Sequence, residues 1–460
     1  MAYLLVIVLY SAAQIALGVW VARRVKGSRD FFVAGRSLGP GLLAATMLAA
    51  NIGGGSTIGA AGRGFRDGIA AWWWIGSAGA GSIALAWWIG PRIRRIAAEH
   101  DLKTVGDFLE WRYDARVRAT IAVLLWAGTV SILAGQLLSM SAVLSTIVGM
   151  AKPEGCVIGA AVATAYFAAG GLKSSVAVNV VQLTVKLLGF AIAFPLALSL
   201  VGGLQGLHAA LPDPANWNIV HNGASGWVYV PMLTPAFIVS PGLLQKVYAA
   251  RDDRAVRIGV GVNAAVLLAF AAIPPVLGMI ARARHPDLAA SDLALPTVFA
   301  RDLPFWIGAL GLAAIFSAEV SAADAILFML ATSFSKDLYK RFLRPDADDR
   351  QVLNAARIST VAGAALAIGV ALGVAQDVVD ALGIFYTLLG VSLFVPVIAG
   401  LYARRADASS ALAAIAGGVA VVAGLQIFRN GASVGVLTPA MLGIGAAAVA
   451  YGAVSFLKER

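Results

Sequence analysis

Long apolar runs separated by short polar segments form the main pattern along this chain of 460 residues. Thirteen runs are long enough to cross the hydrocarbon core of a bilayer as α-helices, which takes roughly 17–25 residues. The pattern therefore predicts an all-α polytopic membrane protein with about 13 transmembrane helices. The predicted spans are residues 3–21, 38–62, 69–90, 117–148, 155–170, 176–202, 226–248, 255–281, 304–334, 354–375, 379–402, 408–427 and 434–456.

The basic residues test this order of spans, because cytoplasmic loops hold an excess of Lys and Arg. With the N-terminus outside, the cytoplasmic segments contain 27 of the 35 basic residues and the outer segments contain 7, while Lys186 lies inside a span. A missed or surplus helix would invert the bias beyond it. We therefore expect a multi-pass protein of the inner cell membrane, with its N-terminus outside and its C-terminus in the cytoplasm.

The composition agrees with a membrane protein, since 60% of the residues are hydrophobic, 13% are charged and the mean hydropathy is +0.82. We interpret the net charge of +11 as a topology signal: the basic loops face the cytoplasm and anionic lipid, and no nucleic-acid binding is expected. The chain contains a single cysteine and no Walker loop, GxSxG or HExxH pattern. We therefore expect neither a cofactor nor enzyme activity.

The second predicted span contains three consecutive glycines near the bilayer midplane, in the stretch NIGGGSTIG, Asn51 to Gly59. Each glycine costs about 1 kcal/mol in a helix interior, so three together predict that the helix unwinds. Unwound backbone at this depth is tolerated where it faces protein or a watery cavity, and its free groups can then hold an ion or a solute. Close packing of small residues against a neighbouring helix is the alternative explanation.

A second interruption lies in the span 226–248, which contains Pro235 and then Ser240, Pro241 and Gly242. Five spans separate the two interruptions, so the two helices cross the membrane in opposite directions. Paired broken helices in two inverted halves are typical of the central site of a secondary transporter. An ordinary proline kink is the alternative.

Four separated blocks of the sequence resemble the sodium:solute symporter family, whose members include proline, sugar, sialic acid and choline transporters. The blocks are FFVAGRSLGPGLLAATMLAANIGGGSTIGAAG (31–62), GGLKSSVAVNVVQ (170–182), SPGLLQKVYAARD (240–252) and FSAEVSAADAILFMLATSFSKDLYKRF (316–342). The resemblance implies a LeuT-type fold built from two inverted five-helix repeats. The expected divisions are an N-terminal helix and cytoplasmic loop (1–37), a first repeat (38–202), an extracellular loop (203–225), a second repeat (226–402) and two C-terminal helices (403–460).

The same resemblance implies a sodium site made of the carbonyls of Ala49, Ile52 and Ala318 with two hydroxyl positions, which here are Ser321 and Ala322. Ala322 has no hydroxyl. A hard cation prefers oxygen ligands, so this loss weakens the site unless another group supplies an oxygen. A serine in a membrane helix can also simply bond the preceding turn.

Charged residues inside spans are costly, at about 2.5–3.5 kcal/mol each on insertion scales, and are functional by default. Lys186 and Glu319 are predicted to lie at one depth on two neighbouring helices. Glu319 could add an oxygen to a sodium site, or the Lys186 ammonium could occupy the cation position and pair with Glu319, which would make transport proton-coupled or sodium-independent. A purely structural pair is the third arrangement. Asn179, where many relatives have aspartate, is a further candidate, and we interpret Asp324 as structural.

The function that these patterns favour is ion-coupled symport of a small polar solute into the cell by alternating access, with sodium as the expected ion. A passive channel or facilitator would share the hydropathy and the charge bias, and the identity of the solute is not indicated. Resemblance to sugar-transporting relatives implies that Trp74 lies near the outer lid of the solute cavity, which makes it a candidate solute-binding residue. The candidate solute-binding residues are Asn51, Gly53, Gly54, Gly55, Ser56, Trp74 and Ser240.

Overall fold

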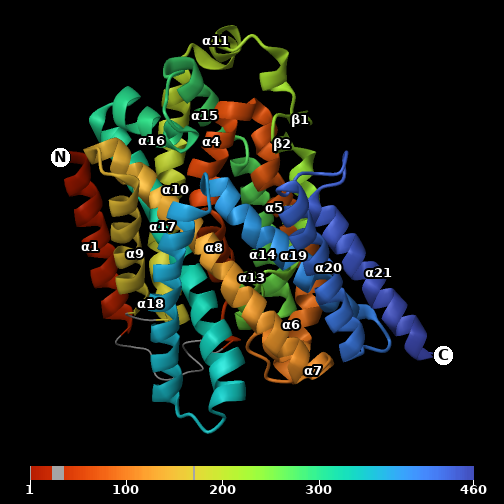
Figure 1. Ribbon diagram of the computed structural model, residues 1–460. Helices are drawn as coiled ribbons and strands as arrows, with labels where there is room; N and C mark the ends of the chain where they lie inside the picture. The colour runs from red at the N-terminus through yellow and green to blue at the C-terminus, as the bar shows by residue number, and fades with distance from the viewer. Residues whose placement is uncertain (1, 23–35, 169–170, 460) are drawn as a thin grey trace.

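The computed structural model describes residues 2–22, 36–168 and 171–459, and the chain forms a bundle of long helices capped at both ends by short helices and loops (Figure 1). The predicted all-α class is confirmed, since the strands among the described residues are the two-residue β1 (His221–Asn222) and β2 (Ser225–Gly226), paired antiparallel. In the described part of the chain, ten helices are long and apolar enough to cross a membrane. The predicted number of thirteen is not confirmed.

The helices follow one another along the chain with short connections. They are α1 (Ala2–Ala22), α3 (Pro40–Asn51), α4 (Ile58–Asp67), α5 (Trp72–Ala84), α6 (Gly90–Glu99), α7 (Val105–Arg112), α8 (Ala115–Val148), α9 (Lys152–Ala168), α10 (Gly171–Ser199), α11 (Gly203–Ala210), α12 (Val230–Val239), α13 (Pro241–Ala249), α14 (Asp253–Phe270), α15 (Ile273–Arg284), α16 (Ala294–Thr297), α17 (Phe305–Thr332), α18 (Asp349–Gly373), α19 (Val378–Tyr402), α20 (Ala408–Arg429) and α21 (Pro439–Glu459).

Aspartate side chains begin many of these helices. Asp114, Asp252, Asp348, Asp377 and Asp407 each accept a hydrogen bond from a backbone N–H of the first turn that follows. These bonds satisfy donors that have no partner within the helix, and the negative charge suits the positive end of the helix dipole.

Both interruptions expected from the sequence are present. Helix α3 ends at Asn51, a 3₁₀ turn covers Gly54–Ser56, and α4 begins at Ile58. Helix α12 ends at Val239 and α13 begins at Pro241, with Ser240 between them in an extended conformation.

A third interruption contradicts the single helix predicted for 255–281. A turn at Ala271 and Ala272 separates α14 from α15, and Pro274 and Pro275 lie in the first turn of α15. Proline lacks a backbone N–H, so it fits the start of a helix and disrupts its interior. The Pro-Pro pair was the sequence signal for this break.

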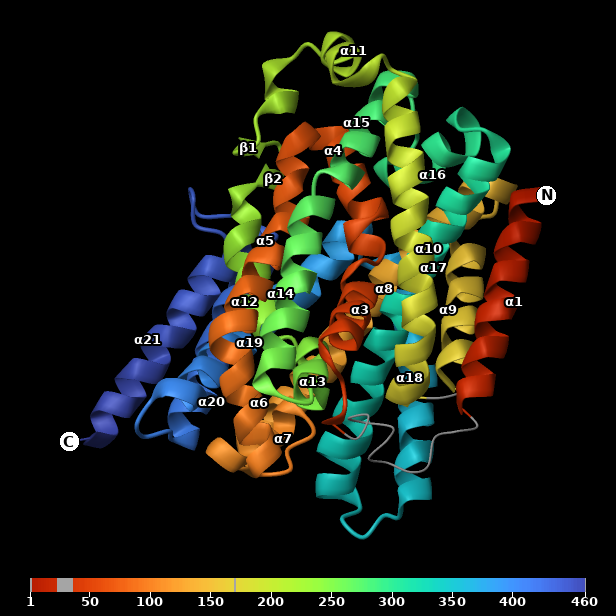
Figure 2. The ribbon, with the colours of Figure 1, turned by 180° about the vertical axis from the view of Figure 1, so that it is seen from behind.

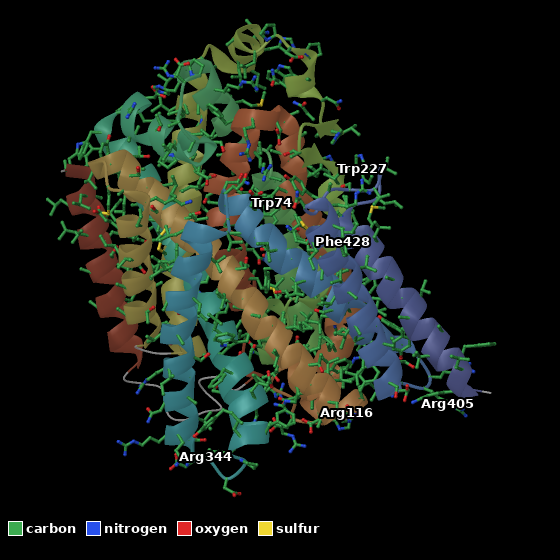
Figure 3. All side chains as sticks on the ribbon, viewed as in Figure 1. Trp74, Arg116, Trp227, Arg344, Arg405 and Phe428 are labelled. Atoms are coloured by element: carbon green, nitrogen blue, oxygen red, sulfur yellow. The ribbon has the colours of Figure 1, made fainter. Side chains whose placement is uncertain are left out.

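The two ends of the chain lie at opposite ends of the bundle, and α11 with β1 and β2 covers the end at which the chain begins (Figure 1). Three arginines from segments predicted to be cytoplasmic, Arg116, Arg344 and Arg405, all lie toward the other end (Figure 3). Seen from behind, α3 runs between α10 and α14 (Figure 2), and it also packs against α17. Most of the loop predicted within 1–37, and the first residues of the blocks 31–62 and 170–182, lie outside the described residues.

A buried arginine joins three elements at the end toward which these arginines lie. The Arg118 guanidinium of α8 lies 2.6 Å from Asp337 Oδ1, 2.9 Å from Asp107 Oδ1 and 2.8 Å from Glu110 Oε2. Asp107 and Glu110 belong to α7, and Asp337 belongs to the helical extension of α17. The Arg118 side chain is 8% exposed, so these contacts are shielded from water.

Replacing Arg118 with methionine is expected to destabilise the protein strongly, because it leaves the buried Asp337 carboxylate without its guanidinium partner. The loss of one partner of a buried ion pair costs about 3–5 kcal/mol. Thermal unfolding of the purified variant measures this effect. The control is Arg116→Met, two residues away, whose side chain is 70% exposed and pairs locally with Asp114; equal stability losses in the two variants would contradict a special role for Arg118.

Candidate functional site

The two helix breaks meet at one cavity in the middle of the bundle. Helices α5, α8, α14, α17 and α19 supply the remaining walls. The polar side chains at its surface are those of Asn51, Ser56, Gln136, Ser240 and Lys246. A central, mostly apolar cavity with a few polar groups is typical of a small-molecule site.

Most of the predicted solute-binding residues line this cavity. These are Asn51, Gly53, Gly55, Ser56, Trp74 and Ser240. Gly54 faces elsewhere: a Cβ atom added to it would lie 2.2 Å from Ser139 Oγ and 2.6 Å from Glu319 Oε2. The structure thus groups the candidates around one space, and their solute contacts remain a prediction.

The unwound segment is held by side chains in place of helical hydrogen bonds. The Gly54 N–H donates to Gln136 Oε1 at 2.8 Å, and the Gly53 N–H donates to Ser56 Oγ at 3.0 Å. The Ser56 hydroxyl in turn donates to the Asn51 carbonyl at 2.8 Å. Buried backbone groups need such partners, so these bonds fix the shape of the break.

Aromatic rings close one side of the cavity. The Trp74 ring meets Tyr229 with centroids 5.1 Å apart and Tyr386 at 6.0 Å, both edge to face. Phe237 packs on Tyr386 at 5.5 Å. Trp74 is 4% exposed, and Figure 3 shows it in the interior, toward the end of the bundle that α11 covers.

The oxygen atoms predicted to hold sodium do converge, but they surround the side chain of Lys186. Its Nζ donates to Ala49 O at 2.7 Å, to Ile52 O at 3.0 Å and to Ser321 Oγ at 2.6 Å. The Ser321 hydroxyl also lies 2.7 Å from Ala49 O and 3.0 Å from Ala318 O. With the ammonium in this position, these oxygens cannot ligate a sodium ion at the same time.

The methyl group of Ala322 adds no ligand at this position. A Cβ added to Gly53 would lie 2.4 Å from Ala322 Cβ, so the methyl group packs against the unwound glycine backbone. Ala322 therefore helps to shape the break without binding a cation.

Glu319 does not take the place of the missing hydroxyl. It is fully buried, and its Oε1 accepts a hydrogen bond from Thr57 Oγ1 at 3.0 Å, just before α4 begins. The hydrogen bonds of Lys186 end on α3 and on Ser321, so the two charges interact through space rather than in a direct hydrogen bond. The glutamate thus connects α17 to the α4 side of the break, and the lysine connects α10 to the α3 side.

The remaining charged candidates lie apart from the cation position. Asn179 is buried on α10, two turns before Lys186. Asp324 is buried on α17, and its charge interacts with that of Lys246 on α13. Lys246 lines the cavity, so Asp324 balances a charge at the cavity wall, in line with the structural interpretation.

Sequence reasoning missed Gln136, Lys246 and Tyr386 at this cavity. Gln136 was visible as a polar residue inside the predicted span 117–148. Lys246 carried no clear signal, because a lysine close to the end of the predicted span 226–248 is ordinary at a membrane surface. Tyr386 carried no local signal, because tyrosine is common in apolar helices.

Charged residues close the cavity's aromatic side. Arg63 of α4 lies 3.4 Å from Asp377 Oδ2 and 3.0 Å from Asp380 Oδ1, and Arg66 lies 2.8 Å from Asp377 Oδ2. Asp292, in the loop before α16, accepts a hydrogen bond from the Val378 N–H at 3.2 Å. The network joins α4 to the start of α19.

A central cavity between two broken helices, within a polytopic helical bundle, defines a secondary transporter. A model of the sodium:solute symporter family matches residues 31–418. The chain belongs to this family, as its four sequence blocks indicated.

Individual relatives agree with this assignment. The chain is 28% identical to the sodium/pantothenate symporter of Escherichia coli (strain K12), over 92% of this chain and 91% of that one. It is 26% identical to the sodium/glucose cotransporter of Vibrio parahaemolyticus, over 78% and 72% of the two chains. Family membership supports sodium-coupled symport of small solutes.

Solved structures establish the fold. The chain matches a Na+-coupled sialic acid symporter in its substrate-bound outward-open state with a TM-score of 0.81 and 18% identity, over 99% of this chain and 98% of that one. A nucleobase-cation-symport-1 family transporter matches with a TM-score of 0.59 and 15% identity, over 93% and 94%. The predicted LeuT-type fold is confirmed.

Replacing Gly54 with alanine is expected to abolish most transport while leaving inserted, folded protein. The new Cβ would collide with Ser139 and Glu319 and push the unwound segment out of place. Uptake by membrane vesicles, normalised to the amount of inserted protein, measures the effect. Gly41→Ala is the matched control on the same helix, since a Cβ there has no atom within 4 Å; near-normal uptake by Gly54→Ala would contradict a working role for the break.

The negative charge of Asp292 is expected to lower the free energy of unfolding near neutral pH. Burial, and after it the Asp377 carboxylate, raises the pKa of Asp292 to about 7. An aspartate in the unfolded chain binds a proton only below about pH 4. The free energy of unfolding therefore falls as the pH rises from about 4 to about 7. Asp292→Asn removes this penalty and retains a hydrogen-bond acceptor for Val378.

Thermal unfolding at several pH values tests this sign. The Asp292→Asn substitution should leave stability unchanged near pH 4.5 and raise it by about 1 kcal/mol at pH 8. Asp287→Asn, in the same loop but exposed, should show no such trend. A stability gain that is constant across the pH range would contradict the assignment.

Proposed function

We propose that the chain is a secondary active symporter that carries a small polar solute into the cell by alternating access. The observation that supports this most directly is the single cavity enclosed between the α3–α4 and α12–α13 breaks. We further propose the inner membrane as its location, with the N-terminus outside and the C-terminus in the cytoplasm. The position of Arg116, Arg344 and Arg405 toward one end of the bundle supports this orientation.

The two broken helices support the proposed inverted repeats, 38–202 and 226–402. Each broken helix is the first helix of its proposed repeat, and residues of both breaks line the cavity. Breaks at equivalent positions are expected when one repeat is the inverted copy of the other.

Alternating access requires that the two ends of the cavity open in turn. The Arg63, Asp377 and Asp380 contacts hold α4 against α19 at one end. The Arg118 and Asp337 contact holds α8 against the end of α17 at the other. We propose that these networks are the two gates, since each holds two helices together at one end of the cavity.

The cavity lining suggests a solute with an apolar body and a few polar groups. Trp74 and Tyr386 offer ring faces and edges, Asn51 and Gln136 offer amides, and Lys246 offers a positive charge balanced by Asp324. Relatives are named for glucose, pantothenate, proline and choline. These four, with sialic acid from the similar solved structure, form the first panel of solutes to test.

The resemblance to the family implies a coupling cation between the α3 break and α17, but the Ala49, Ile52 and Ser321 oxygen atoms there bind Lys186 Nζ. Sodium is the ion that family membership supports. The second candidate is a passive facilitator, which is supported by the sequence pattern alone. Accumulation of the solute against its gradient distinguishes a symporter from a facilitator.

Replacing Trp74 with alanine is expected to lower the rate of solute uptake roughly tenfold or more, because a lost aromatic contact of about 1.4 kcal/mol corresponds to a tenfold change in affinity. The measurement is uptake into proteoliposomes of the panel solute that raises the melting temperature of the purified protein. The control is Trp87→Ala, since Trp87 is 50% exposed on the outer face of the bundle. Equal uptake by the two variants would show that Trp74 does not contact the solute. Equilibration of the solute without accumulation in the wild type would identify a facilitator.

A further inference from the structure

The Lys186 ammonium has one hydrogen-bond acceptor for each of its N–H donors. An ammonium group carries three N–H donors and no acceptor, and Nζ has three acceptors at 2.6–3.0 Å. The residue is fully buried. The fold therefore provides this side chain with a complete shell, which a lysine packed only by its aliphatic stem would not need.

The acceptors are those that the family's sodium site would use. Ala49 O and Ile52 O are the carbonyls left free where α3 ends, and Ser321 is the one hydroxyl that remains of the expected two. The ammonium has the single positive charge of sodium but needs three oxygen atoms, fewer than the roughly five expected for the sodium site. The loss of the hydroxyl at Ala322 removes an oxygen that an ammonium does not require.

The charges around Lys186 are few. Helix α3 contains no charged residue, and α1, which packs on α10, contains none either. Helix α17 contributes Glu319, which faces the ammonium through space, and Asp324, which interacts with Lys246. The nearest titratable group of α1 is Tyr10, whose hydroxyl donates to Ser317 at 2.7 Å. Glu319 is therefore the countercharge of Lys186 among the described residues.

A polar strip leads away from Lys186 along α10. Gln182 and Asn179 lie four and seven residues before it, on the same face of the helix, and both are buried. Neither amide atom of the Gln182 side chain has a protein partner among the described residues, and Gln182 lines a small cavity with Tyr10 and Gln14.

We propose that the Lys186 ammonium is a built-in replacement for the sodium ion, so that solute movement does not depend on sodium binding between α3 and α17. In this position Nζ holds α10 to the free end of α3 and to Ser321. The three N–H donors of the ammonium match these three acceptors.

The inference rests on the proposed transport function, but its sodium arm can be measured without transport. The purified protein is unfolded thermally in sodium chloride and in potassium chloride at equal ionic strength. We expect the melting temperature of the wild type to be the same in both salts. The same should hold for the control Lys152→Met, which replaces an exposed lysine on α9. A sodium-specific rise in the wild type would overturn the proposal.

The double substitution Lys186→Ala with Ala322→Ser should create a sodium site, because it removes the tethered cation and restores the second hydroxyl. We expect sodium to raise the melting temperature of this variant, and radioactive sodium to bind it in one-to-one ratio. If the variant does not fold, the wild-type comparison still decides the outcome. If the variant folds and ignores sodium, the oxygen set is not a cation site and the proposal fails.

The transport arm uses proteoliposomes and the panel solute selected by thermal stabilisation. We expect equal uptake with and without an imposed sodium gradient. Lys186→Met should lower the uptake, whereas Lys152→Met should leave it unchanged. Uptake that requires a sodium gradient would overturn the proposal; absence of all uptake would reject the proposed function for that solute and leave the sodium arm to decide on Lys186.

Discussion

The structure depends on how the backbone groups freed at the α3 break are satisfied. A helix that stops in the middle of a membrane leaves carbonyl groups with no water to bind, and each unsatisfied group costs several kcal/mol. Here the carbonyls of Ala49 and Ile52 accept hydrogen bonds from Lys186 Nζ. The N–H groups of Gly53 and Gly54 donate to Ser56 and Gln136. The break is therefore stable because neighbouring helices complete it, and any movement of those helices changes its bonding.

This arrangement links three helices to one charge. Lys186 belongs to α10, its carbonyl acceptors belong to the end of α3, and Ser321 belongs to α17. Removing the proton, or moving α10, would leave buried oxygen atoms without donors, which is costly in a region of low dielectric constant. A cation at this point can therefore bias the bundle between two arrangements, whether it arrives from solution or is tethered to the chain.

Glu319 lowers the cost of burying the tethered charge. An isolated ammonium in a membrane interior is strongly unfavourable, and a nearby carboxylate reduces the net charge of the region. The glutamate bonds Thr57 at the start of α4, whereas the lysine bonds the end of α3. The pair therefore spans the break, so opposite charges act on its two sides, and the glycines between them can turn without carrying side chains through the narrow space next to Ser139.

Local chemistry in the sequence determined the elements. The apolar runs predicted a helical membrane protein, and Gly53 to Gly55 and Ser240 to Gly242 marked both breaks, because glycine and proline act on their own backbone. Charges within apolar runs singled out Lys186 and Glu319. The tertiary structure alone decided which oxygen atoms meet the ammonium, since Ala49 and Ser321 lie 137 and 135 residues from Lys186 along the chain. It also brought Gln136 and Tyr386 to the cavity, because a cavity wall is made by packing between distant helices and leaves no periodic trace in any one of them.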